Sequence, residues 1–323
     1  MFAKTLRLVL ACAILFWTFH STAQNSKYIR PMRCYVITSH RQSSYYSNYS
    51  EPMQDTKGSS AVNFDFGGNT FLGDLGGSMG TGRHFIKDFN YKTVRPFFGV
   101  DYLYFPSNWL SVKGGIHHTV VTGADSLIKK REGHSAGRFE RNLSFQSAIT
   151  EVSAEFELYP LQTFWEYEES RCRPFISSGI GFFHFNPKAQ LNGKWYNLNP
   201  LHLEGQGFPE YPERKNYKLT QPYIPLTIGL RYRLTNNYFI SLSGCFRKTF
   251  TDYIDDVSTT YIAPALFNKY LSPTNAALAK QLYYRASKNS VTYSPTQYRG
   301  YTGKDSYTSF FFTITYLFNK RDD

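Results

Sequence analysis

The chain has 323 residues, a formal net charge of +12 at pH 7 and a negative mean hydropathy of −0.41. Beyond the N-terminal segment, no apolar run reaches the ~20 residues that a membrane-spanning helix needs, so the composition excludes a helical membrane protein. The positive charge favours anionic neighbours over nucleic acid, and the 26 Tyr and 28 Phe residues suit the aromatic girdles of a membrane β-barrel.

The N-terminus has the organisation of a secretory signal peptide. A short basic segment precedes an apolar run at residues 8–19, and small residues follow around Ala23. We expect residues 1–23 to be a signal peptide that is removed after Ala23. The alternatives are an uncleaved anchor, for which the run is short, and a lipoprotein acylated at Cys12.

The exported part of the chain divides into two regions. Residues 24–59 are polar and lack a sustained period, so we expect a partly disordered periplasmic extension, followed by one folded domain at residues 60–323. Cys34 and Cys172 are expected on the periplasmic side, where they either form a disulfide or remain separate thiols. Cys245 is expected as a small buried residue on a strand.

The folded domain contains eight segments with the two-residue period of β-strands. In the clearest, the hairpin at residues 222–247, apolar side chains alternate with polar ones on both arms. Its arms run for about 10 to 13 residues, which exceeds the ~5–6 of soluble strands and reaches the roughly 9–11 that a tilted bilayer-crossing strand needs. We expect strands at residues 60–72, 93–104, 109–122, 145–159, 174–186, 222–234, 238–247 and 306–318.

The connections between these strands alternate in length. Those after the first, third, fifth and seventh strands are long, and the others are short or medium, as in barrels with both termini in the periplasm. We therefore predict an all-β protein, a closed antiparallel eight-stranded transmembrane barrel of OmpA-like size in the outer membrane of a Gram-negative bacterium. A soluble β-sandwich or lipocalin-like barrel with its apolar face inward is the alternative. Basic residues at 83–87 and 129–141 suit lipopolysaccharide phosphates, or are ordinary solvated loop charges.

Six charged residues fall on the polar faces of the expected strands. They are three acids, Glu151, Glu155 and Glu157, and three arginines, Arg231, Arg233 and Arg247. We expect them to form ion pairs inside the barrel, because an unpaired buried charge is costly. The alternative is a metal or acid–base site built from the three carboxylates.

The sequence offers little for catalysis. The segment at residues 133–137 matches G-x-S-x-G, but it lies in a basic loop without the strand-turn-helix elbow that makes such a serine reactive. His117 and His118 are adjacent on a strand and point to opposite faces, so they cannot share a metal. We expect no catalytic residue, cofactor or metal. A lipid A-modifying enzyme would have to use His118, His134 and Ser135.

The outer loops carry the most unusual sequence, in the stretches FNPKA, GKWYNLNPL, EGQG and TDYIDDVS. The three aspartates of the last stretch predict either a hard-cation site with oxygen ligands or loop-capping hydrogen bonds. The positions that stand out in the four stretches are Asn186, Pro187, Trp195, Tyr196, Glu204, Gln206, Asp252, Tyr253, Asp255 and Asp256.

These stretches, together with GNTFLGD at residues 68–74 and RNLSF at 141–145, resemble the PorG-type, DUF6089-like outer-membrane barrels of the type IX secretion apparatus. The likeness spans about residues 60–318, and the chain departs from it in the insertion at about 263–301 and in the N-terminal extension. The resemblance implies an integral barrel that associates with a periplasmic ring of lipoprotein and partner subunits.

On this basis the periplasmic surface is where partners are expected to bind. Trp165 and Tyr167 are the candidate contacts, and an aromatic girdle that touches only lipid is the alternative. The sequence thus favours a noncatalytic barrel component of a protein-export or envelope assembly. A lipid A-modifying barrel enzyme and a narrow pore or adhesin are the competing functions.

Overall fold

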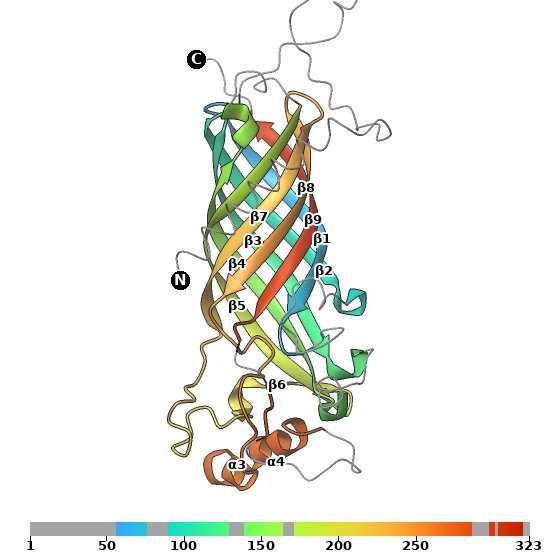
Figure 1. The fold of residues 1–323 in the computed structure, drawn as a ribbon, viewed down its shortest axis with the longest axis vertical. Helices are drawn as coiled ribbons and strands as arrows, with labels where there is room; N and C mark the ends of the chain where they lie inside the picture. Colours follow the sequence, from blue (N-terminus) through green and yellow to red (C-terminus); the bar gives the residue numbers. More distant parts are fainter. Residues whose placement is uncertain are drawn as a thin grey trace, which may run out of the picture. The chain divides into compact units, whose positions relative to one another are not determined.

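The computed structural model describes residues 56–75, 90–128, 139–163, 171–285, 297–300 and 303–318, and within them nine strands form one antiparallel sheet. The strand order is β4-β3-β2-β1-β9-β8-β7-β5-β6, and β4 also pairs with β5, so all strands except β6 close into an eight-stranded barrel (Figure 1). The strands are β1 (Ser60–Leu72), β2 (Arg95–Ser107), β3 (Leu110–Ala124), β4 (Ser144–Leu158), β5 (Cys172–Leu191), β6 (Lys194–Asn197), β7 (Thr220–Arg233), β8 (Tyr238–Thr249) and β9 (Ser306–Phe318).

The barrel is closed by its first and last strands. β1 and β9 pair along their whole lengths, from Ser60 opposite Phe318 to Leu72 opposite Ser306. Closure leaves the eight strands without an open edge, so the backbone hydrogen bonds are satisfied within the sheet, as the hydrocarbon layer of a membrane requires. The predicted closed eight-stranded antiparallel barrel is therefore confirmed.

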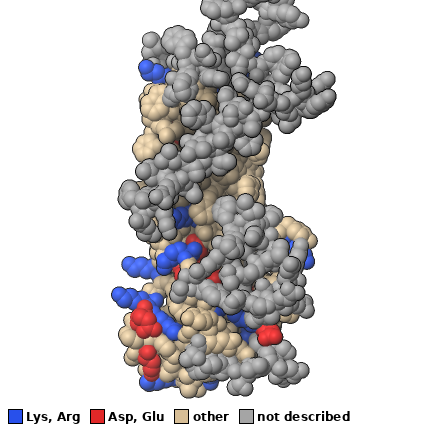
Figure 2. All heavy atoms as spheres, in the orientation of Figure 1, with Lys and Arg blue, Asp and Glu red and all other residues tan. Residues whose placement is uncertain are grey.

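Apolar side chains cover the outside of the barrel and polar ones fill its inside. On β7, Ile228 is 63% exposed whereas Thr227 is 2% exposed, and on β8, Leu242 and Ser241 differ in the same way. Where the upper barrel wall is visible in Figure 2 it is almost uncharged, and most of the visible Lys, Arg, Asp and Glu side chains lie toward the lower end. The soluble alternative, with the apolar face inward, is wrong.

The long connections all leave one end of the barrel. The turns β2–β3 and β7–β8 need only a few residues, and the β4–β5 connection contains a short 3₁₀ helix at Pro160–Thr163. The connections β1–β2, β3–β4, β5–β7 and β8–β9 are much longer, and we refer to their end as the outer end. Further 3₁₀ turns lie at Tyr91–Thr93, Asp125–Leu127 and Asn199–Leu201.

The outer connections contain structure that the sequence analysis treated as loop. β5 continues to Leu191 and returns as β6 through Asn192 and Gly193, which both have positive φ (50° and 81°) as an Asn-Gly hairpin turn requires. The β8–β9 connection contains the helices α3 (Ala265–Tyr270) and α4 (Pro273–Leu282). In the described part of the chain, no helix has the length and apolarity to cross a membrane.

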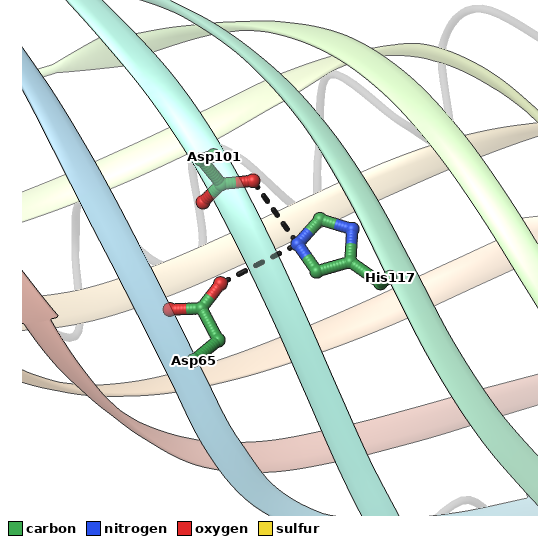
Figure 3. A group of neighbouring side chains, drawn as sticks. All are labelled: Asp65, Asp101 and His117. Atoms are coloured by element: carbon green, nitrogen blue, oxygen red, sulfur yellow. Dashed lines mark ion pairs between the residues drawn. The ribbon is translucent and has the colours of Figure 1, made fainter.

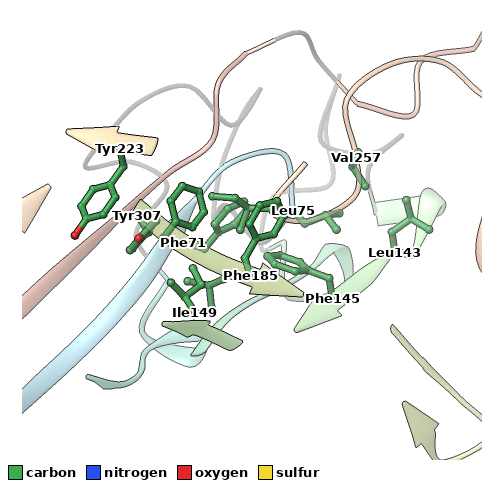
Figure 4. Close-up of a cluster of buried hydrophobic side chains, with 12 residues drawn as sticks. Phe71, Leu75, Leu143, Phe145, Ile149, Phe185, Tyr223, Val257 and Tyr307 are labelled. Carbon is green, nitrogen blue, oxygen red and sulfur yellow. The ribbon is translucent and has the colours of Figure 1, made fainter. Parts of the chain in front are cut away.

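Hydrophobic clusters fill the described interior at several levels. One lies at the outer end of the barrel, where Phe71, Phe145, Phe183 and Tyr307 pack with residues of the outer connections (Figure 4). A second, around Phe105, Tyr159 and Phe175, lies at the short-turn end. A third buries α3 and α4 against the β5–β7 connection and includes Leu198, Leu201, Leu203, Phe208, Tyr261, Ile262, Phe267, Ala276, Ala279 and Leu282.

Candidate functional site

The centre of the barrel holds a buried ion pair between β8 and β4. Arg247 donates from Nε to both carboxylate oxygens of Glu151, at 2.8 and 2.9 Å, and its Nη2 lies 2.6 Å from Oε1. The Tyr307 hydroxyl donates to Oε2 at 2.7 Å, and Arg247 Nη1 donates to Ser309 Oγ at 2.9 Å. This geometry satisfies both charges and ties three strands together across the lumen.

Two further carboxylates of β4 are paired closer to the short-turn end. Arg231 Nη1 lies 2.8 Å from Glu157 Oε1, and the Tyr159 hydroxyl contacts both groups. Glu155, which we expected to pair with an arginine, instead lies 3.2 Å from Lys113 Nζ, because the β3–β4 register places Lys113 directly opposite it. Arg233 is buried at the short-turn end, with its guanidinium 5.0 Å from the centre of the Phe239 ring.

A second group of lumen residues joins β1, β2 and β3. His117 Nε2 lies 3.1 Å from Asp101 Oδ1 and 3.4 Å from Asp65 Oδ2, so both carboxylates converge on one ring nitrogen (Figure 3). The three side chains are 5%, 2% and 1% exposed, respectively. His117 also stacks on Phe97, with ring centres 5.4 Å apart. Oxygen and imidazole ligands of this kind can hold a divalent metal.

Two glycines make this convergence sterically feasible. Gly99 lies between Asp65 and His117 in one cross-strand row, and Gly115 lies opposite Asp101. A Cβ atom on Gly99 would approach His117 Cδ2 to 2.0 Å, and one on Gly115 would approach Asp101 Oδ1 to 1.8 Å. The absence of side chains at Gly99 and Gly115 therefore leaves room for side chains from three strands to meet.

Four of these lumen residues were not predicted: Asp65, Asp101, Lys113 and His117. They are isolated charges on three different strands, so no local spacing marks them. The one signal in the sequence is the alternation of each strand, which places all four residues on its polar face. On β3, for example, His117 points inward and the adjacent His118 points outward. Only the strand register brings them together.

Glu204 of the EGQG stretch is the centre of a second polar network, in the outer connections. Its carboxylate accepts hydrogen bonds from the backbone N–H groups of Ser258 and Thr259, both at 2.9 Å, and from Arg299 Nη1 at 3.1 Å. Glu204 is fully buried, and Arg299 is nearly so. Two stretches that are about 50 residues apart in sequence, EGQG and TDYIDDVS, are thus joined by one carboxylate.

The aspartates of TDYIDDVS bind backbone and side-chain donors in the outer connections. Asp255 accepts from Val257 N at 3.0 Å and Leu75 N at 3.2 Å, and Asp252 accepts from the Ser258 hydroxyl at 2.7 Å. These are the loop-capping hydrogen bonds that we gave as one reading of these residues. Burial and the nearby Asp74 raise the pKa of Asp252 to about 7, and burial with neighbouring carboxylates raises the pKa of Asp255 well above its usual value.

The remaining motif residues have mixed environments. Asn186 donates to Asn197 at 3.3 Å, and the Pro187 carbonyl accepts from Leu198 N at 2.8 Å. Gln206 is buried and accepts from Glu204 N, whereas Trp195 is 48% exposed. Tyr196 packs against the α3–α4 cluster, Tyr253 stacks on Tyr217 with ring centres 4.6 Å apart, and Asp256 accepts from the Tyr217 hydroxyl at 2.7 Å.

Several predicted features lie outside the described residues and stay predictions. They are the signal peptide at residues 1–23, most of the extension at 24–59, Cys34, the basic residues at 83–87 and 129–138, His134, Ser135, Trp165 and Tyr167. Cys245 is described and is buried, and His118 points away from the lumen with its Nδ1 2.9 Å from Thr150 Oγ1.

A closed barrel with an apolar exterior and charges paired inside defines an integral outer-membrane protein of Gram-negative bacteria. The family described as "Domain of unknown function (DUF6089)" matches residues 60–262, which is more than half of the chain, and the protein belongs to this family. No curated protein matches the sequence.

The fold is similar to those of small outer-membrane barrels of known structure. Ail, the attachment invasion locus protein of Yersinia pestis, is 9% identical, with 81% of this chain and 99% of Ail covered and a TM-score of 0.36. OprG from Pseudomonas aeruginosa is 8% identical, with 84% of this chain and 100% of OprG covered and a TM-score of 0.34. Neisserial surface protein A is 7% identical, with coverages of 80% and 97% and a TM-score of 0.35.

Proposed function

We propose that this protein is a noncatalytic barrel component of a protein-export assembly of the type IX secretion kind, or of a related envelope assembly, and that it binds periplasmic partner subunits. The observation that carries the proposal is the filled lumen. Buried pairs such as Arg247–Glu151 and Arg231–Glu157 cross the interior, with aromatic clusters at both ends. A barrel filled in this way suits a membrane-anchored scaffold better than a conduit.

The competing functions have less support from the described residues. A pore needs a continuous polar path, whereas the pairs Arg231–Glu157 and Arg247–Glu151 form close contacts of 2.8 and 2.6 Å inside the lumen. Of the residues that a lipid A-modifying enzyme would have to use, His118 lies on the outward face of the barrel with its Nδ1 2.9 Å from Thr150 Oγ1, and His134 and Ser135 lie outside the described residues. Neither arrangement favours an enzyme or a channel.

The partner surface is proposed to lie at the short-turn end, which faces the periplasm. Trp165 and Tyr167 belong to the β4–β5 connection, which emerges at that end together with the β2–β3 and β7–β8 turns. Aromatic residues such as these are enriched at the centre of protein interfaces. The lipid-girdle alternative predicts the same residues but no partner.

The test is affinity purification of the tagged chain from native membranes in mild detergent, followed by mass spectrometry of the retained proteins. We expect periplasmic subunits in stoichiometric amounts, and their loss from the double variant Trp165→Ala/Tyr167→Ala. Trp195→Ala is the matched control, since it removes an exposed aromatic at the outer end and should keep the partners. A wild-type barrel that purifies without any periplasmic subunit would overturn the proposal.

A further inference from the structure

We infer that Asp65, Asp101 and His117 form a binding site for one divalent transition-metal ion inside the barrel. The inference is independent of the proposed role in secretion. It begins from the positions of the three residues, each of which offers one ligand atom, and these atoms all lie within 4.8 Å of one another. They come from three consecutive strands, so a single ion would join β1, β2 and β3.

The spacing of these atoms fits a coordination polyhedron. Metal–ligand bonds of about 2.1 Å place neighbouring ligands about 3.4 Å apart in a tetrahedron and about 3.0 Å apart in an octahedron. The observed separations from Nε2 are 3.4 Å to Asp65 Oδ2 and 3.1 Å to Asp101 Oδ1. Three protein ligands leave at least one further coordination position.

Hydrogen bonding alone leaves the two carboxylate oxygens of the site unsatisfied. Asp65 Oδ2 and Asp101 Oδ1 are buried and have no hydrogen-bond partner among the described residues, although both approach His117 Nε2. The imidazole Nε2 carries at most one proton, so it cannot donate a full hydrogen bond to both oxygens at once. A metal ion bound to Nε2 would instead accept a lone pair from each of the two carboxylate oxygens.

Each carboxylate is held by its other oxygen. Thr313 Oγ1 donates to Asp65 Oδ1 at 2.6 Å, and Asn63 Nδ2 donates to Asp101 Oδ2 at 3.2 Å. The oxygens that point at His117 are therefore oriented by outer contacts, as in established metal sites. Stacking on Phe97 fixes the plane of the imidazole ring.

The charge of the group also suits a cation. Arg247 and Arg231 are committed to other carboxylates at 2.6–2.8 Å, and Lys113 lies 3.2 Å from Glu155 but 4.0 Å from Asp101. Among the described residues, the ion-pair contacts of Asp65 are with His117. A divalent ion would neutralise the two aspartates and leave the imidazole neutral. The mixed nitrogen and carboxylate ligands favour Zn²⁺, Co²⁺ or Mn²⁺ over Ca²⁺.

The test uses the full-length mature barrel refolded in detergent with ZnCl₂, CoCl₂ or EDTA, because the buried site is most accessible during folding. After desalting, elemental analysis should give about one Zn²⁺ per chain, and Co²⁺ should give visible absorption bands of a nitrogen–oxygen site without thiolate charge transfer. Asp65→Asn and His117→Gln should each reduce the bound metal at least tenfold. The matched control is His118→Gln, the adjacent histidine on the outward face, which should keep it.

Heat-dependent gel mobility distinguishes folded from unfolded barrels, and the bound metal is compared only between samples that this assay shows to be folded. If Asp65→Asn does not fold, the ligands can be identified in the wild type from the Co²⁺ spectrum and from X-ray absorption. Folded wild-type barrel that binds no metal after refolding with either ion would overturn the inference. Full binding by the folded His117→Gln variant, or equal loss in His118→Gln, would also overturn it, because the three atoms could not then be the ligands.

Discussion

Replacing Glu151 by Gln should destabilise the barrel strongly, because it leaves the Arg247 guanidinium buried without its counter-charge. Glu151 and Arg247 are 1% and 2% exposed, and their three nitrogen–oxygen contacts lie at 2.6, 2.8 and 2.9 Å. Removing one partner of such a buried pair costs about 3–5 kcal/mol. The double variant Glu151→Gln/Arg247→Met removes both charges and should recover about 0.5–3 kcal/mol relative to the sum of the single variants.

The free energies of unfolding would be measured by urea titration of barrels in lipid vesicles, in EDTA so that metal binding makes no contribution. Lys269→Gln is the control, since Lys269 and Glu210 form an exposed pair at 2.8 Å whose loss should not shift the urea midpoint. A cost below about 1 kcal/mol for Glu151→Gln, or strictly additive effects in the double variant, would refute a dry, ion-paired lumen.

Three further predictions concern the barrel wall and the outer connections. Ile228→Arg should cost about 2–4 kcal/mol in vesicles, whereas Leu234→Arg near the turn should cost about 0–1 kcal/mol, and equal costs would contradict the lipid-facing assignment. Glu204→Ala should speed hydrogen exchange of the Ser258 and Thr259 amides, because the Glu204 carboxylate accepts a hydrogen bond from each of them. The heat-dependent gel mobility of the barrel should stay unchanged. Because the pKa of Asp252 is raised to about 7 from its ordinary 3.8, the folded outer connections bind a proton that the unfolded ones do not. Their stability should therefore fall as pH rises from about 4 to 7, and Asp252→Asn should weaken this dependence, as seen by hydrogen exchange corrected for intrinsic rates.

The architecture could be predicted because barrel strands encode their orientation locally. Ile228 and Thr227 are adjacent in sequence, and Ile228 points to the outside of the barrel whereas Thr227 points into the lumen. The two-residue period alone therefore assigns the faces. The number of segments with this period gives the number of strands, and the connection lengths assign the two ends of the barrel. Neither inference needs a contact between residues distant in sequence.

The pairing of lumen residues could not be predicted, because it depends on register. Glu155 pairs with Lys113 because these residues are opposite each other on β3 and β4, and Arg247 reaches Glu151 across the lumen rather than along a strand pair. The convergence on His117 further depends on Gly99, which looks unremarkable in a strand sequence. These contacts follow from closure of the barrel.

The outer connections were underestimated for a different reason. Local signals were present, with Asn192-Gly193 marking a hairpin and Ser272-Pro273 marking the start of α4, where the Ser272 hydroxyl caps Asn275 N. What makes these elements stable is the cluster that they bury together with Leu203. Such a cluster joins segments that are far apart in the chain, so its existence is not visible in any one of them.

The most direct test of the central claim is the collision profile of a nitroxide side chain at residue 228 in vesicles, with the native cysteines replaced. The claim is that the apolar face of the barrel contacts lipid and the charged face is enclosed. It predicts that oxygen, which dissolves in the bilayer, relaxes the nitroxide far more than a water-soluble nickel chelate does, and that this order reverses at residue 236 in the β7–β8 turn. A nitroxide at residue 228 that collides mainly with the water-soluble chelate would contradict the claim.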